Sequence, residues 1–289
     1  MKFAKSPLTL QEQINHIQNH YNIKCKDENL IKHYLLHCNY YKLRGYWLFF
    51  EEIKRSVYFE EVVNLYEFDK KLRMLFMDYI EIVETSIKSI FAYHLTNKYG
   101  TSHIHLRKCI FYNEKYYYQS IVQLKENYKK SKEIFANHFQ TKYDEDLPPL
   151  WASVEIMTLG EISKWFSNVN MYDQKEISKY YKFPTKSLRT LFINLTEVRN
   201  ICAHHSRLWN KRLANAISIP KKFQISNPKT FKIYHTLITM DELLKNIPSK
   251  NNLLYEFCKI TLEHNIPIKY MGFPKNHNIK GLENAKYEY

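Results

Sequence analysis

The sequence predicts an all-α protein, and three observations carry this prediction. The chain has 289 residues but only 5 glycines, too few for the repeated tight turns of a β protein. Apolar residues recur at alternating steps of three and four over residues 65–90, which is the period of one helix face. Capping residues and helix-ending residues also punctuate the chain. We therefore expect a helical bundle with a small N-terminal helical lobe, divided into residues 1–56 and 57–289.

The N-terminal lobe is expected to begin with two helices. Thr9 and Glu12 have the spacing of a capping box, which predicts a first helix over residues 9–21. The pattern predicts a second helix over residues 27–41, with Gly45 breaking the chain after it.

Residues 40–47 interleave aromatic and cationic side chains in the order Tyr-Tyr-Lys-Leu-Arg-Gly-Tyr-Trp. Such a run can stack on RNA, in which case Lys42, Arg44 and Tyr46 would make the contacts. More often such a run forms a hinge that packs its rings into the core. The sequence leaves both interpretations open.

The longest predicted helix follows the lobe and spans about 35 residues, which is typical of the spine of a helical bundle. We expect it to stop at Gly100, acting as the left-handed residue after the helix end. Glu84 and Lys88 lie beside its apolar stripe at i,i+4, and this spacing by itself predicts an ordinary exposed ion pair. The stripe consists of Leu65, Phe68, Leu72, Leu75, Tyr79, Ile82, Val83, Ile87 and Ile90.

Further helices complete the expected bundle. Pro149 suits the first turn of a helix that we expect to run to about Val169. Pro184 precedes a helix whose apolar face is Leu188, Leu191, Phe192, Leu195 and Val198. Other helices are expected over residues 113–132, 174–181, 231–246 and 252–264, with a less regular stretch around Pro220 and Pro228, and regular structure ending at Pro267 and Pro274.

The net charge narrows the class of partner. The chain carries 43 Lys plus Arg against 29 Asp plus Glu, a formal charge of +14, which favours a polyanion such as nucleic acid.

No apolar run approaches the ~18 residues that a membrane span needs. The first seven residues lead into a polar helix, so we expect no signal peptide. Five scattered cysteines without a Cys-x-x-Cys pair indicate reduced thiols in the cytoplasm.

Residues 199–205, Arg-Asn-Ile-Cys-Ala-His-His, hold the best candidate for chemistry. An arginine can hold a phosphate as a planar fork, and a histidine can give and take protons near neutral pH. On an ideal helix, however, Arg199 and His204 lie ~140° apart. They converge only if the arginine reaches around, the helix ends there, or a second chain helps. Otherwise the residues form an ordinary helix end, with Arg199 paired to an acid and the histidines near the helix dipole.

Other kinds of enzyme have less support. His33, His37 and the adjacent Cys38 could begin a zinc site, as could Cys202 with the two histidines after it, but neither set has the second pair of ligands that a structural zinc site needs. The sequence also lacks a glycine-rich phosphate loop and a Gly-x-Ser-x-Gly motif. We therefore predict no metal and no cofactor.

Several ordered blocks resemble the Abi-like proteins, the bacterial abortive-infection family of AbiD and AbiF type. The main blocks are residues 148–160 (Pro-Pro-Leu-Trp-Ala-Ser-Val-Glu-Ile-Met-Thr-Leu-Gly), here called the signature segment, residues 65–73 and residues 199–210. Residues 7–10, 40–46 and 271–274 fit the same pattern. The spacing of Arg199 and His204 also resembles the Arg-x4-6-His motif of the HEPN ribonucleases.

The resemblance implies a HEPN-type helical fold and an endoribonuclease that acts in phage defence or in a toxin–antitoxin pair. By position, Arg199 and His204 match the catalytic arginine and histidine of the motif, and Asn200 matches their polar neighbour. Glu84 matches a recurring acidic position on the long helix. Lys88 stands where an arginine is expected, which retains the charge but loses the bidentate fork.

The resemblance also implies RNA as substrate, and a structured noncoding RNA or an antitoxin as partner. His205 would support the site, and Arg207 would contact RNA. Because acid and base roles suggest two histidines and the chain holds a single Arg-x4-His, we expect a homodimer with facing motif helices. The alternatives are a non-catalytic RNA-binding or sensor protein of the same fold, or a helical scaffold for protein interactions.

Overall fold

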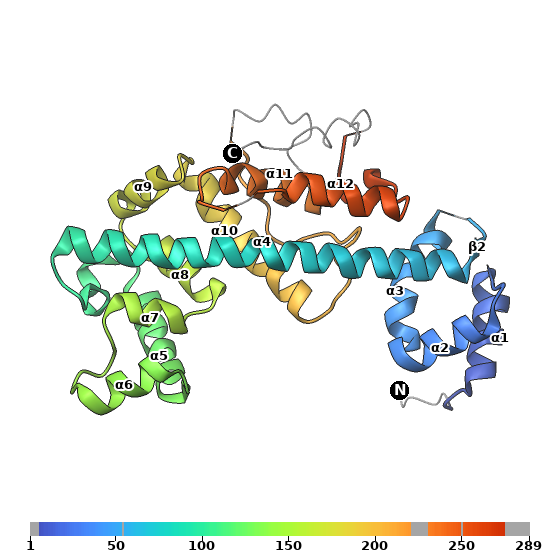
Figure 1. Ribbon diagram of the computed structural model, residues 1–289, viewed down its shortest axis with the longest axis horizontal. Coiled ribbons are helices and arrows are strands. Elements are labelled where there is room, and N and C mark those ends of the chain that lie inside the picture. Colours follow the sequence, from blue (N-terminus) through green and yellow to red (C-terminus); the bar gives the residue numbers. More distant parts are fainter. Residues whose placement is uncertain (1–5, 54, 221–230, 250, 275–289) are drawn as a thin grey trace. The chain divides into compact units, whose positions relative to one another are not determined.

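A computed structural model describes residues 6–53, 55–220, 231–249 and 251–274. Within these ranges the chain forms twelve α-helices and a single pair of two-residue strands, which confirms the all-α class (Figure 1). None of the helices in the described ranges is long and apolar enough to cross a membrane. The chain divides into two compact units, residues 1–73 with 259–267, and residues 74–258 with 268–289. The expected domain boundary at residue 56 stays a prediction.

The first unit begins with the predicted capping box. Glu12 N donates to Thr9 Oγ1 at 3.3 Å, and Thr9 N donates back to Glu12 Oε2 at 2.7 Å. Two short strands pair in parallel, with Ile23 opposite Val57. The elements are α1 (Leu10–Tyr21), β1 (Ile23–Lys24), α2 (Glu28–Cys38), α3 (Tyr40–Glu52), β2 (Val57–Tyr58) and the first part of α4 (Phe59–Tyr99).

The break after the second helix occurs at Asn39, so the expected break at Gly45 is wrong. Asn39 takes a left-handed φ of 66°, and its side chain accepts a hydrogen bond from Tyr41 N at 2.9 Å, which caps α3. Gly45 instead lies inside α3, where it faces open space.

The aromatic and cationic run at residues 40–47 is only partly in the core: Leu43, Tyr46 and Trp47 are buried, whereas Tyr41 is 73% exposed. Trp47 and Tyr46 are each 1% exposed, and the Tyr46 hydroxyl donates to Asp69 Oδ2 at 2.7 Å. Arg73 Nη1 completes a buried triad by donating to the same Asp69 oxygen at 2.5 Å. Burial raises the pKa of Tyr46 well above its usual range. The expected RNA contact by Tyr46 is therefore wrong. Lys42 and Arg44 are half-buried, and their RNA contacts stay predictions.

The second unit contains the rest of α4 and the remaining helices. Gly100 follows α4 with a left-handed φ of 61°, as predicted. The elements are α5 (Glu114–Lys130), α6 (Ile134–Lys142), α7 (Leu150–Ile156), α8 (Leu159–Asn168), α9 (Met171–Tyr180), α10 (Thr185–Ala203), α11 (Ile233–Leu244), α12 (Leu253–Glu263, shared with the first unit) and three 3₁₀ turns, Ile104–Leu106, Lys108–Ile110 and Ile268–Met271.

Two expectations about this unit are wrong. The single helix expected up to about Val169 is two helices, α7 and α8, because Thr158 and Glu161 form a second capping box that starts α8. The expected helices leave residues 133–148 without one, but α6 lies there. The predicted apolar face of α10 is fully buried. Pro228 lies outside the described residues.

Candidate functional site

The motif helix ends inside the motif. α10 stops at Ala203, and His205 adopts a left-handed φ of 52°. Two backbone hydrogen bonds close the end, from Ser206 N to Ile201 O and from His205 N to Cys202 O, both 2.9 Å. This is the Schellman arrangement, in which glycine is the usual left-handed residue. His204 therefore stands at the helix terminus with an exposed side chain.

His204 and Asn200 line a groove between α8 and α10, here called the motif groove, of about 630 Å³. Gly160 of α8 faces Thr196 so closely that an added Cβ would lie 3.1 Å from its methyl group. The rings of Phe166 and Phe192 are also in contact. Phe166 lies six residues after Gly160 on α8, and Phe192 lies four residues before Thr196 on α10, so the two helices run antiparallel. The start of α8 therefore lies beside the end of α10.

Arg199 does not line the motif groove. This agrees with the helical geometry, which places Arg199 and His204 on different sides of α10. Its side chain is half-buried, whereas those of Asn200 and His204 are exposed. None of the three side chains forms a hydrogen bond or ion pair with another residue in the part of the chain that is described. The expected pairing of Arg199 with an acid is thus not observed there, and all three polar groups are available to a ligand.

The segment of residues 214–218, here called the polar strap, also borders the motif groove, and its position was not predicted from the sequence. The Glu197 carboxylate accepts hydrogen bonds from Ala214 N at 2.8 Å and from Asn215 N at 2.9 Å. One turn before Glu197 on α10, Asn194 Nδ2 donates to Asn215 O at 2.6 Å. Two turns before Glu197, Thr190 Oγ1 accepts from Ser218 N at 2.9 Å. The available signal was weak: Asn194 is a polar residue within the apolar face of α10, next to Leu195. The strap places Asn215 in the groove wall.

The other expected site residues occupy varied positions. Glu84 and Lys88 form an ion pair of 2.9 Å on α4, with side chains 19% and 12% exposed, so the pair is more buried than the ordinary surface pair that the spacing suggested. In the described ranges, no hydrogen bond or ion pair joins this pair to Arg199 or His204. Arg207 is half-buried three residues after His204.

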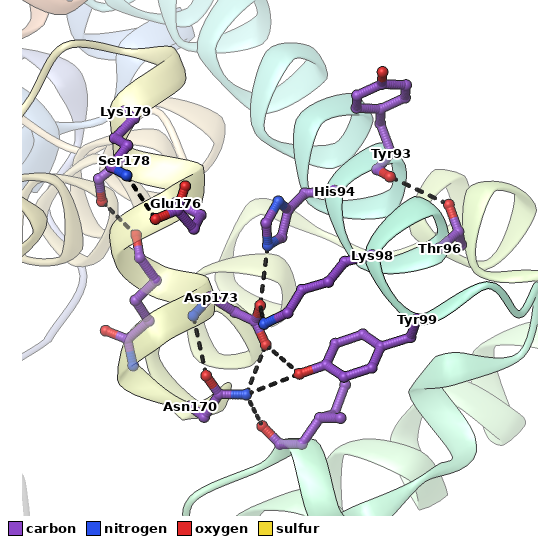
Figure 2. Close-up of polar contacts among 12 residues, drawn as sticks. Tyr93, His94, Thr96, Lys98, Tyr99, Asn170, Asp173, Glu176, Ser178 and Lys179 are labelled. Carbon is purple, nitrogen blue, oxygen red and sulfur yellow. Dashed lines mark hydrogen bonds and ion pairs between the residues drawn. The ribbon is translucent and has the colours of Figure 1, made fainter.

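A second polar cluster lies on α4 and α9 of the same unit. Figure 2 shows the buried carboxylate of Asp173 facing His94, Lys98 and Tyr99 of α4. His94 Nε2 lies 3.0 Å from Oδ1, Lys98 Nζ donates to Oδ1 at 2.6 Å, and the Tyr99 hydroxyl donates to Oδ2 at 2.8 Å. Asn170 Nδ2 adds a fourth contact at 2.6 Å. Burial opposes ionisation, but these hydrogen bonds outweigh it and hold the pKa of Asp173 at about 2.

The suggested zinc ligands do not assemble into a larger cluster. The rings of His33 and His37 lie 4.7 Å apart on α2. Over the described ranges, no group of three or more His, Cys, Asp or Glu side chains is placed to hold a metal ion.

Comparison with known proteins identifies the family. The sequence model of the Abi-like proteins matches residues 33–210, more than half of the chain. The chain belongs to the Abi-like family. No curated protein and no solved structure matches it. The matched range of this Abi-like protein begins in α2 and ends just after the motif, so it includes both helices of the motif groove.

Proposed function

We propose that this Abi-like protein is a metal-independent endoribonuclease of HEPN type, acting in the cytoplasm as a phage-defence effector or as the toxin of a toxin–antitoxin pair. The observation that carries the proposal is the exposed imidazole of His204 beside Asn200 in an open groove at the end of α10. Membership of a family named for abortive infection supports the defence role.

The chemistry follows from the properties of three side chains. His204 takes the proton from a ribose 2′-hydroxyl or gives one to the departing 5′-oxygen. Arg199 stabilises the negative charge that develops on the phosphate, and Asn200 orients the phosphate or the imidazole. The 2′-oxygen attacks the phosphorus, the bond to the 5′-oxygen breaks, and the products are a 2′,3′-cyclic phosphate and a 5′-hydroxyl. DNA lacks the 2′-hydroxyl and is not cleaved.

The position of Arg199 supports a composite site. Because Arg199 lies outside the motif groove of its own chain, we propose that two chains pair with their α10 helices facing each other. Each phosphate would then meet arginine and histidine from both copies. The pair would supply the two histidines that separate acid and base roles require.

The test is cleavage of total RNA and tRNA by the wild type, Arg199→Ala and His204→Ala in EDTA, with chemical identification of the product ends. We expect cleavage by the wild type alone, with His204→Ala slower by about 10²–10⁴-fold. His37→Ala is the matched control, because it removes an exposed histidine from α2 and should cleave normally. Cleavage that stops in EDTA, or survives in His204→Ala, would contradict the proposal.

The second candidate is a non-catalytic RNA-binding or sensor protein with a structured noncoding RNA or an antitoxin as partner. The Schellman end of α10 favours it, because His204 and His205 also suit a plain helix terminus. The two candidates differ in one measurement. An enzyme loses cleavage but keeps RNA affinity in His204→Ala, whereas a sensor never cleaves, even when purified free of bound RNA.

A further inference from the structure

The signature segment borders three hollows of the second unit. Thr158 and Gly160 line the motif groove. Trp151 and Glu155 line an open trough of about 560 Å³, here called the aromatic trough. Trp151 also lines a smaller hollow of about 270 Å³, the aromatic pocket. Trp151 therefore lines both the aromatic trough and the aromatic pocket. The same signature segment also borders the motif groove.

Trp151 differs from the other tryptophans of the chain in its exposure. Its side chain is 53% exposed, whereas Trp47, Trp165 and Trp209 are each at most 2% exposed. Burial of a large aromatic ring stabilises a fold, and exposed rings that gather on one surface mark interaction sites. Trp151 sits in the first turn of α7, where a polar residue would serve the helix equally well.

The opposite wall of the aromatic trough is one face of α4. Ser89 lies four residues before Tyr93, and Thr96 and Asn97 lie three and four residues after it, so all four share that face. Tyr93 is 59% exposed, and its ring points away from the Asp173 cluster (Figure 2). The trough thus has an exposed aromatic ring on each wall, with hydroxyl and amide groups between them.

Aromatic side chains continue beyond the trough on both sides. The Tyr93 ring meets that of Tyr180 at 6.5 Å, and Lys98 Nζ lies 4.1 Å from the centre of the exposed Tyr172 ring. On the other side of Trp151, the aromatic pocket is walled by Phe139 and Tyr143. The Asp173 cluster holds α9 against α4, so these rings stand on packed helices.

We propose that this aromatic track, with Trp151 at its centre, binds single-stranded RNA by stacking its bases. The inference rests on RNA being the ligand in the proposed function, but it does not require cleavage. Exposed aromatic rings stack on bases of any sequence, and serine, threonine and asparagine can hydrogen-bond the 2′-hydroxyl. The net charge of +14 complements a polyanion. The lining of the trough combines the rings of Trp151 and Tyr93 with hydroxyl and amide groups, and among the described residues its one charged side chain is Glu155.

The test uses the emission of Trp151 itself. In the His204→Ala background, which keeps the RNA intact, a short unstructured RNA is titrated into the protein. Because the other three tryptophans are buried, stacking on Trp151 should quench the exposed part of the emission. Trp151→Phe should abolish this quenching while retaining most of the affinity, because phenylalanine can still stack. Trp151→Ala and Tyr93→Ala should each weaken binding by about 5- to 100-fold.

Matched controls distinguish the track from other surfaces. Tyr112→Ala removes a tyrosine that is 89% exposed outside the track, and RNA affinity should be unchanged. Affinity for a blunt RNA duplex should not respond to Trp151→Ala, since paired bases cannot stack on the ring. Unchanged single-strand affinity in Trp151→Ala, or an equal loss in Tyr112→Ala, would overturn the proposal. So would a change in sedimentation of the RNA-free protein in Trp151→Ala, which would identify the track as a contact between copies.

The result is independent of whether the protein cleaves RNA. If the wild type proves inactive, the same titration with wild-type protein still measures stacking on Trp151. Loss of affinity in Trp151→Ala would then support the track while the endoribonuclease proposal fails.

Discussion

His205 shows how one residue sets the geometry of the candidate site. Its left-handed backbone ends α10 at the point where His204 reaches the motif groove. Such a conformation costs an L-residue roughly 1–2 kcal/mol relative to a right-handed one, and histidine tolerates it better than most. The residue whose side chain is expected to support catalysis is thus also the residue that turns the chain.

We expect His205→Gly to keep the fold and to stabilise it by up to about 1 kcal/mol, because glycine relieves the strain, although its greater freedom in the unfolded chain offsets part of the gain. Thermal unfolding measures this change. If His205 acts only through its backbone, RNA cleavage should also persist.

His205→Val is the contrasting variant. A β-branched residue is disfavoured at this φ, so the helix end should unwind, and both the melting temperature and His204-dependent cleavage should fall. A valine variant as stable as the wild type would show that the turn is not under strain. Loss of cleavage in the stable glycine variant would instead assign a role to the imidazole of His205.

At the scale of elements, the sequence predicted helix ends where a chemical signal stood alone. Thr9 with Glu12, and Gly100, were recognised and are confirmed. Thr158 and Glu161 carry the same capping-box signal, but they lie inside a continuous apolar pattern that favours a single helix. The break at Asn39 was not predicted for a different reason. Gly45 is the stronger local signal for a break, but tertiary packing keeps Gly45 inside α3.

The Asp173 cluster makes a pH-dependent contribution to the packing of α9 on α4. The pKa of the Asp173 carboxyl is about 2, below the value of 3.8 for a free aspartate. The folded state therefore stabilises the ionised carboxylate relative to the unfolded state. The contribution, about 2 kcal/mol, is fully present above pH ~4 and is lost as the pH falls towards 2.

Asp173→Asn should therefore lower the free energy of unfolding at pH 7 and flatten its dependence on pH between 4 and 2, as measured by denaturant unfolding. Asp144→Asn is the matched control, because Asp144 is exposed and should change neither quantity. An equally steep acid dependence in Asp173→Asn would locate the titrating groups elsewhere.

At the scale of the whole molecule, the sequence could place Asn200 and His204 on one side of α10 and Arg199 on another, since this follows from 100° per residue. It could not predict the motif groove, the polar strap or the exposure of Trp151. Those features depend on which helix packs against which, and the antiparallel packing of α8 on α10 has no local signature.

The proposed dimer makes a quantitative prediction. Consider wild type mixed with a ninefold excess of His204→Ala and allowed to exchange subunits. If each site needs His204 from both copies, the mixture should show about 1% of the activity of the same total amount of wild type. If each site needs one His204, it should show about 10%. Activity should follow the square of the wild-type fraction. A linear dependence after demonstrated exchange, or cleavage by a strict monomer, would rule out the two-histidine site.

The polar strap along α10 has a consequence for exchange with heavy water. The amide hydrogens of Ala214, Asn215 and Ser218 are bonded to helix side chains although they lie outside any helix or strand. They should exchange with deuterium more slowly than the amides of an ordinary loop. Because Asn215 borders the motif groove, an RNA seated there should slow them further, so the strap would report on occupancy of the groove even when the RNA is not cut.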